Sequence, residues 1–428
     1  MGIYSCNSTT KETKEINYSD DEIVQLYDYL ITRYLVLRQE VIDINGDFEY
    51  NKIVYNELGK ATFANPNLDV AYNEAWVAVD ENNPVIIEVP KIEGRYYTTQ
   101  FLDEWNETFV NINPKNFDKP YGKFALCLEG VEYDLEDDIT RIDMISRKAH
   151  LLARVELKDS PEVAVEYQKQ FDMYVYQNGS PKIDEPALES FPLDRLLGVE
   201  LFEMAPEVLA TAKDRMPDAE QHQKKILEIA EKIKGDAEYR KHVDKVCKSQ
   251  AVPYVLGSVS KYGKLRNGWG KTEVIGVYGN DYFSRTVISL IGIWANTTNE
   301  VIYFTGNMGS DGERLHGNKS YEFRFKADAL PESVVDDFWS VILVDAIDYF
   351  VVQNPLNHFN FNNYSNLTFE ENGDLVIFCG LELLEGYHES NWLPTPKDKN
   401  FSLSARLYGP RKELSEGDWF MPEIRVVK

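Results

Sequence analysis

The sequence predicts a mainly β protein with a helical segment, in which an immunoglobulin-like sandwich is followed by helices and a C-terminal jelly-roll β-sandwich. Three observations lead to this fold class. The chain is rich in aromatic residues, with 26 Tyr and 21 Phe, and aromatic side chains favour strands. Short apolar runs alternate with turn clusters over residues 61–157, and the same texture returns from residue 271 onward. The region between them has helical periodicity instead.

The N-terminal part of the chain divides into a polar tail and a helix. Residues 1–18 are expected to form a disordered tether, because residues 7–18 are polar. In the helical segment 19–60, Ser19 and Glu22 have the spacing of a capping box, which marks a helix start. Apolar residues then recur every three or four positions, as expected of one buried helix face: Ile23, Leu26, Tyr27, Leu30, Tyr34 and Leu37.

The remaining boundaries follow from the same kinds of pattern. Residues 61–157 contain runs such as "AWVAV" and "KFALCL" between turns, which is typical of a β-sandwich of roughly immunoglobulin size. Residues 158–270 are expected to be helical, with Pro161 at one helix start and Gly235 at another helix end. Residues 271–428 predict a second sandwich of jelly-roll type. In this region "DDFWSVILVDAIDYFVVQNP" is rich in Val, Ile, Phe and Tyr, which favours strands over a helix.

Charge and composition exclude several classes of partner. The chain has 428 residues, with 71 acidic against 45 basic residues and a formal net charge of −26. Such a negative surface repels phosphate backbones and anionic membranes, so we expect no nucleic-acid binding. No apolar run is long enough to span a membrane, so we expect no transmembrane segment. Composition and charge do not decide the oligomeric state, and they are compatible with a homo-oligomer.

The chain lacks the motifs of the common cofactor and nucleophile chemistries. It contains no GxSxG elbow, no HExxH and no P-loop, and its cysteines form no CxxC pair. Asp311, Glu313 and His316 are metal-ligand types, but the Asp-Gly in "SDGERLH" foremost predicts a hairpin turn, and no fourth ligand adjoins it. We therefore expect no metal and no cofactor.

Cys6 indicates two alternative fates for the N-terminus. "IYSC" followed by the polar "NSTTKETKE" is similar to the cleavage box of a bacterial lipoprotein, which would place a lipid tether at Cys6. The other interpretation is a disordered tail in which Cys6 is incidental. The first predicts an exported protein, periplasmic or at the cell surface, and the second a soluble cytoplasmic one.

Two regions resemble known domain families. "NPNLDVAYNEAWVAV", "NPVIIEVPKIEGRYYTTQFLDEWNETFVNI" and Arg154 are similar to the DUF1254 domain. "YGNDYFSRTVISLIG", "DGERLHGNKSYEFRF", "NPLNHFNF", "NWLPTP" and "FSLSARLYGP" are similar to the DUF1214 domain. The resemblance spans most of residues 55–428 and implies the same order of sandwich, helices and jelly roll. Many members of this two-domain family carry export signals, and no biochemical function is established for it.

Three positions depart from the usual pattern of the family. Val70 stands where Thr is common, His316 where Asp is common, and His358 where Arg-Tyr is common. A site that depended on that Thr or Arg would be altered in this protein.

The first predicted sandwich offers one polar cluster. The two segments that carry this cluster lie on either side of the strand "VIIEVP". Side chains that project from the same face of neighbouring strands can converge. A carboxylate beside an arginine and a tyrosine suits the binding of a polar ligand, or the holding of a water for hydrolysis. The alternative is a buried Asp–Arg pair that only locks the fold. The cluster consists of Asn67, Asp69, Tyr72, Arg95, Tyr97, Gln100 and Asp103.

Glu107, Trp392 and Arg406 are three further candidates for the site. Asp103 and Glu107 would lie about 13 Å apart on a strand, which fits neither geometry of glycosidase carboxylates. Trp392 in "NWLPTP" is either a ring that stacks on a sugar or a plug that fixes its loop. Arg406 in "ARLYGP" is expected on a strand that ends near Tyr408.

The first hypothesis of function is an exported or surface-tethered protein that binds a polar small molecule or glycan between its β-domains. It needs only aromatic rings and hydrogen-bonding groups, which the sequence supplies. Its ligand-binding residues would be Asn67, Tyr72, Gln100, Trp392 and Arg406.

The second hypothesis is a cofactor-free hydrolase. It would use Asp69 or Asp103 together with Arg95 and Tyr97. No motif specifies an aligned nucleophile or water, so the sequence favours binding and does not decide whether the protein is an enzyme.

Overall fold

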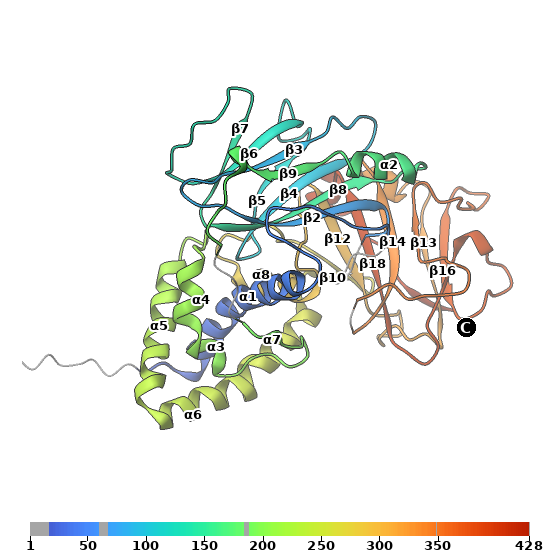
Figure 1. The fold of residues 1–428 in the computed structure, drawn as a ribbon. Coiled ribbons are helices and arrows are strands. Elements are labelled where there is room, and N and C mark those ends of the chain that lie inside the picture. The colour runs from blue at the N-terminus through green and yellow to red at the C-terminus, as the bar shows by residue number, and fades with distance from the viewer. Residues whose placement is uncertain (1–16, 60–66, 184–187, 348, 428) are drawn as a thin grey trace, which may run out of the picture.

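The described residues form four β-sheets and a group of helices in a computed structural model, whose arrangement is drawn in Figure 1. The structure describes residues 17–59, 67–183, 188–347 and 349–427. Cys6 and most of the expected tether lie outside the described residues. The sheets pack in pairs as two sandwiches, which confirms the predicted mainly β fold class with a helical segment.

The first sandwich packs a five-stranded sheet against a four-stranded one. Successive side chains of a strand point to opposite faces, so alternate residues such as Ala75 and Val77 fill the space between the sheets. The strands extend from Val54 to Val175, whereas the sandwich was expected over 61–157. In sheet order the five strands are β1 (Val54–Tyr55), β2 (Val70–Ala78), β8 (Lys148–Glu156), β4 (Tyr97–Asp103) and β5 (Thr108–Ile112), and the four are β7 (Thr140–Met144), β6 (Gly122–Leu128), β3 (Val85–Val89) and β9 (Asp172–Val175).

The five-stranded sheet is buried on both faces. Every residue of β2 and of β8 is buried, whereas a sheet that bordered water would alternate between buried and exposed positions. One face forms the core of the first sandwich. The other packs against the second sandwich and the helices through a cluster that includes Tyr72, Trp76, Leu152, Trp294, Val301 and Tyr408.

The second sandwich pairs a six-stranded sheet with a four-stranded one. The strand character expected of "DDFWSVILVDAIDYFVVQNP" holds for Trp339–Asp345, which forms β14 in the six-stranded sheet. In sheet order the six strands are β10 (Lys264–Arg266), β11 (Trp269–Lys271), β12 (Val301–Gly306), β18 (Phe401–Tyr408), β14 and β15 (Asn360–Asn362), and the four are β17 (Trp392–Pro394), β16 (Leu375–Gly380), β13 (Ser320–Phe325) and β19 (Arg425–Val427).

Most helices gather beside the first sandwich, and α1 lies between them and the strands (Figure 1). The predicted capping box of Ser19 and Glu22 is present at the start of α1. Helix α8 lies in the region where strands were expected; Asp281 caps it, and its carboxylate accepts a hydrogen bond from the Ser284 N–H. No helix of the described ranges is long and apolar enough to cross a membrane. The helices are α1 (Asp20–Asn45), α2 (Pro161–Gln168), α3 (Glu200–Glu203), α4 (Ala205–Thr211), α5 (Ala219–Gly235), α6 (Ala237–Val246), α7 (Val252–Ser258), α8 (Tyr282–Ile291) and α9 (Lys412–Ser415).

Candidate functional site

A small cavity lies between the two sandwiches, where β2 and β8 of the first meet β12 and β18 of the second. Its volume is about 50 Å³, and α8 with the segment that follows it completes the wall. We call it the interdomain cavity. Its larger polar and aromatic lining residues are Tyr72, Arg154, Trp294, Tyr303, Arg406 and Tyr408.

Strand register brings two tyrosine–arginine pairs to this cavity, one from each sandwich. Tyr72 of β2 lies directly opposite Arg154 of β8. Tyr303 of β12 lies directly opposite Arg406 of β18. Directly opposed residues on neighbouring strands share a face of their sheet, so each pair projects toward the other sandwich. The Arg154 guanidinium carbon lies 5.7 Å from the centre of the Tyr72 ring, which is a cation–π distance.

Arg154 carries a buried positive charge without an acidic partner. It is 3% exposed, its Nη1 donates to Gln100 Oε1 at 2.6 Å, and its Nη2 donates to the Trp294 carbonyl oxygen at 2.7 Å. No carboxylate in the described part of the chain forms an ion pair with it. Burial opposes its charge, but the surrounding tyrosines raise its pKa, so the guanidinium stays protonated. Because an arginine has five N–H donors, donors remain for a ligand.

Arg406 differs from Arg154 because an acid lies near it. Burial raises the pKa of Asp69, while hydrogen bonds and the charge of Arg406 act to lower it. Asp69 Oδ1 accepts hydrogen bonds from the side-chain amides of Asn362 at 2.6 Å and Asn360 at 2.7 Å. Both asparagines belong to β15, so Asp69 fastens the start of β2 to the second sandwich.

The tyrosine hydroxyls at the cavity accept hydrogen bonds from the protein. The backbone N–H of Asn67 donates to Tyr72 at 3.1 Å, and its side-chain amide donates to Tyr408 at 3.1 Å. The backbone N–H of Asn296 donates to Tyr303 at 3.0 Å. Burial raises the pKa of Tyr303 and Tyr408, so both phenols stay protonated. The Tyr303 and Tyr408 hydroxyls, which accept these bonds, each keep an O–H group that can donate.

The cavity therefore has a donor-rich side and an apolar side. Guanidinium and phenol groups from the strands form the first, while Ile275, Ile288 and Ile291 contribute to the second. Among the described lining residues, none carries a carboxylate, imidazole or thiol. Such a lining complements a small anion with an apolar part, because its charge-assisted donors face negative charge.

Four of the five residues expected to bind a ligand lie at or beside the interdomain cavity. Tyr72 and Arg406 line it, Asn67 orients two of its tyrosines, and Gln100 holds Arg154. Trp392 lies elsewhere, on β17, where its indole N–H donates to the Gly380 carbonyl at 2.8 Å. That bond fixes the loop, so the ring does not contribute to this cavity.

The four catalytic candidates do not form one site. Asp69 precedes β2 and Asp103 ends β4; both flank β8, where Val70 pairs with Glu156 and Asp103 pairs with Ala149. Seven residues of strand separate these partners, a distance of about 23 Å. The expected meeting of Asp69 and Asp103 across the sheet does not occur, because they lie at opposite ends of it.

Arg95 and Tyr97 are also engaged away from the cavity. Arg95 Nη1 donates to the carbonyl oxygens of Glu156 at 2.8 Å and Leu157 at 3.2 Å. Tyr97 belongs to the core of the first sandwich, and its hydroxyl donates to the Pro120 carbonyl at 3.3 Å. Strand alternation therefore turns Tyr97 away from the second sandwich.

Asp103 and Glu107 are brought together by a turn, so the spacing expected for a continuous strand does not apply. β4 ends at Asp103, Asn106 adopts a positive φ of 62°, and β5 begins at Thr108. Asp103 Oδ1 accepts hydrogen bonds from the N–H groups of Trp105 at 2.9 Å and Glu107 at 3.1 Å. Burial raises the pKa of Asp103 to about 6 and that of Glu107 to about 7.

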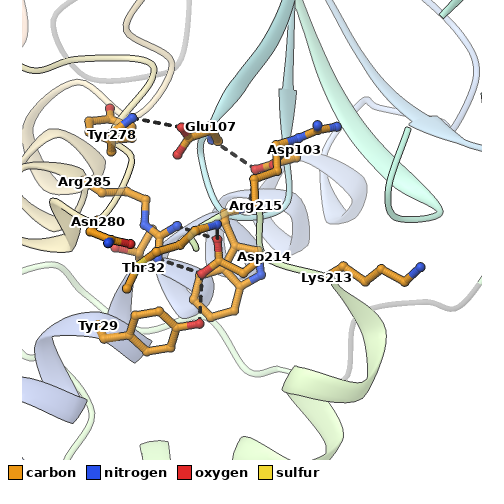
Figure 2. A network of polar contacts seen from close by, with 12 residues as sticks. Tyr29, Thr32, Asp103, Glu107, Lys213, Asp214, Arg215, Tyr278, Asn280 and Arg285 are labelled. Carbon is orange, nitrogen blue, oxygen red and sulfur yellow. Dashed lines mark hydrogen bonds and ion pairs between the residues drawn. The ribbon is translucent and has the colours of Figure 1, made fainter. Parts of the chain in front are cut away.

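Figure 2 shows the network around this turn, which joins it to α1, α8 and the segment before α5. Arg285 Nη1 and Nη2 donate to the two oxygens of Asp214 at 2.8 and 3.0 Å, and both side chains are buried. Arg215 Nε lies 3.2 Å from Asp103 Oδ2, and Glu107 accepts a hydrogen bond from the Tyr278 N–H at 2.9 Å. We call this the junction network; its charged members are Asp103, Glu107, Asp214, Arg215 and Arg285.

The metal-type residues of "SDGERLH" form a turn stabilised by a lysine. Lys319 Nζ lies 2.7 Å from Asp311 and 2.6 Å from Glu313. His316 Nδ1 accepts a hydrogen bond from the Asn318 N–H at 3.2 Å. Within the described ranges no group of three or more His, Cys, Asp or Glu side chains is arranged to hold a metal ion.

A second hollow of about 270 Å³ opens along the same domain boundary. β5 and the loop after it form one side, and Thr297, Asn299 and Glu300 form the other. Asn111 of this cleft donates to the Asn296 side chain at 2.9 Å, so Asn296 contacts lining residues of both hollows.

Sequence reasoning singled out Arg154 only as a mark of family resemblance, and it missed Trp294 and Tyr303. A signal for Tyr408 was present, because Arg406 and Tyr408 are two residues apart on one strand and so share a face. The isolation of the Arg154 charge left no signal in the sequence, since it depends on which acids fold near it.

Two family models match the chain. One is described as "Protein of unknown function (DUF1254)" and matches residues 50–175; the other, "Protein of unknown function (DUF1214)", matches residues 300–412. No curated protein matches the chain.

Two solved structures are similar to this chain. The crystal structure of the VPA0106 protein from Vibrio parahaemolyticus is 20% identical, covers 95% of this chain and 100% of its own, and superposes with a TM-score of 0.64. A putative uncharacterized protein from Burkholderia cenocepacia is 13% identical over 95% of each chain, with a TM-score of 0.47. At these identities the first likeness supports the fold alone.

Proposed function

Because the chain belongs to the DUF1254/DUF1214 two-domain family, whose descriptions state no function, we propose from its geometry that it binds a small organic anion in the interdomain cavity. Arg154 carries this proposal: it is buried in the cavity wall and no described carboxylate neutralises it. An isolated buried ion is unfavourable by several kcal/mol. A bound anion would offset that penalty and form charge-assisted hydrogen bonds.

The size of the cavity narrows the first hypothesis. A volume of about 50 Å³ suits a small molecule better than a glycan. The donor-rich lining agrees with a polar ligand held between the β-domains, contacted by Tyr72 and Arg406 as well as by Arg154.

The hydrolase alternative has less support. Asp69 fastens two domains through amide hydrogen bonds, and Asp103 accepts backbone hydrogen bonds within a turn at the other end of the sheet. Neither carboxylate lines the interdomain cavity.

Calorimetric titration with acetate and with phosphate tests the proposal. We expect the wild-type protein to bind at least one of these anions, and Arg154→Gln to weaken that binding at least tenfold, because a hydrogen bond to a charged group contributes about 1.5–3 kcal/mol. Arg95→Gln is the matched control, since Arg95 bonds to backbone carbonyls outside the cavity.

Circular dichroism would show that both variants remain folded. Unchanged affinity in Arg154→Gln, or an equal loss in Arg95→Gln, would refute the assignment of the anion to Arg154.

Export and a tether at Cys6 stay a prediction of the sequence. Fractionation of cells that express the protein from its native gene, followed by mass spectrometry of the N-terminal peptide, tests both. Cytoplasmic protein with an unmodified Cys6 would refute them.

A further inference from the structure

We infer that the ligand of the interdomain cavity is a short aliphatic monocarboxylate, such as acetate or propionate; this rests on the proposed function and names its ligand class. Three features of the cavity lead to this class: its volume, its charge and the division of its lining into two chemical halves.

The volume sets the size of the ligand. A cavity of about 50 Å³ accommodates a ligand of only a few non-hydrogen atoms. Acetate has four such atoms and propionate has five. Aromatic acids and sugars exceed this size.

The charge of the lining sets the charge of the ligand. Asp69 lies in the electrostatic neighbourhood of Arg406, whereas Arg154 has no acidic counterpart in the described structure. One negative charge therefore balances Arg154. A second would be buried without a partner, which strongly opposes binding of a dianion.

The division of the lining sets the character of the remaining atoms. Arg154 and the tyrosines provide donors on the strands, while Ile275, Ile288 and Ile291 provide an apolar wall. A carboxylate directed to Arg154 leaves the alkyl group against this wall, where burial of each CH₂ contributes favourably. Phosphate and sulfate have no apolar part to place there.

Calorimetric titration with a matched set of small molecules tests the inference. The set is acetate, propionate, butyrate, succinate, phosphate, sulfate and acetamide, the last being a neutral molecule of the size of acetate. We expect acetate or propionate to bind at least tenfold tighter than phosphate, sulfate, succinate and acetamide.

A cavity variant tests the placement of the alkyl group. Ile291→Ala removes side-chain atoms from the apolar wall and so enlarges the cavity on that side. The affinity for butyrate relative to acetate should therefore rise at least threefold. Ile42→Ala, on the exposed side of α1, is the matched control and should leave that ratio unchanged.

The outcomes separate the two levels of the proposal. Tighter binding of phosphate, sulfate or succinate would overturn the monocarboxylate class and leave anion binding standing. Equal binding of acetate and acetamide, or no binding of any anion, would overturn both. An unchanged butyrate-to-acetate ratio in Ile291→Ala would overturn the placement of the alkyl group.

Discussion

The interdomain cavity and the junction network are both buried and polar, yet they treat charge in opposite ways. In the junction network each arginine meets an acid: Arg285 binds Asp214 and Arg215 lies against Asp103. In the cavity Arg154 donates to an amide oxygen and a carbonyl oxygen and lies over the Tyr72 ring, and no described carboxylate pairs with it. Paired charges hold elements of the fold together, whereas an unpaired buried charge favours the binding of a ligand of opposite charge.

The junction network also has an excess charge, of the other sign. Its three carboxylates, Asp103, Glu107 and Asp214, outnumber its two arginines, and burial raises the pKa of Glu107 to about 7. Excess carboxylates are neutralised by taking up protons, whereas an arginine keeps its charge near neutral pH. Excess buried charge is therefore neutralised by protonation in the junction network and, as we propose, by a bound anion in the interdomain cavity.

The largest expected effect is the loss of the Asp214–Arg285 pair. Asp214→Ala leaves Arg285 charged, buried and without its bidentate partner, so we expect the free energy of unfolding to fall by about 3–5 kcal/mol. Urea denaturation followed by circular dichroism measures this loss. Asp336→Ala breaks the exposed Asp336–Arg411 pair and should change stability by less than about 1 kcal/mol. Equal effects of the two variants would show that the network does not hold the fold.

The next effect concerns pH and Glu107. Its pKa rises from 4.5 to about 7 on folding, so the folded state keeps a proton that the unfolded state releases. The contribution of protonated Glu107 to the free energy of unfolding is complete below pH 4.5 and is lost as the pH rises through 7.

Glu107→Gln should therefore gain stability relative to the wild type as the pH rises from 5 to 8, by about 2 kcal/mol. Thermal denaturation of both proteins across this range measures the difference. Glu220→Gln, at an exposed position of α5, is the control and should follow the wild type. A pH-independent difference for Glu107→Gln would contradict the assigned pKa.

The smallest expected effect on stability is that of Arg154→Met. Removing an unpaired buried charge relieves its desolvation, while the acceptors Gln100 and Trp294 lose their donor. These terms oppose each other, so the free energy of unfolding should change by no more than about 1 kcal/mol. Urea denaturation without added anions measures it. A loss as large as that of Asp214→Ala would make Arg154 a residue of the fold and remove the contrast between the two regions.

Much of the architecture was predictable because it depends on local pattern. The capping box at Ser19, the strand β14 and the mainly β class follow from residue spacing and type. The position of Tyr72 and Arg406 beside the second domain follows from strand alternation once the two sandwiches are placed.

The rest of the site depends on contacts that spacing does not encode. The partners of Arg154 are 54 and 140 residues away, so its lack of an acid is a property of the folded chain. Asp103 and Glu107 looked separated because the segment was treated as a continuous strand, and the positive φ of Asn106 turns it back. Trp392 gave no local sign of whether its indole would face a ligand or a carbonyl.

The sheet that is buried on both faces limits how this chain can be divided. A fragment that ended after Val175 would expose Tyr72, Trp76 and Leu152 to water, and an apolar surface of that kind promotes aggregation. The matched stretches 50–175 and 300–412 are units of sequence similarity, and we expect that neither folds alone. A protease cut or a gene truncation between these stretches is expected to destabilise both parts. Each part would expose apolar side chains that the other part now covers.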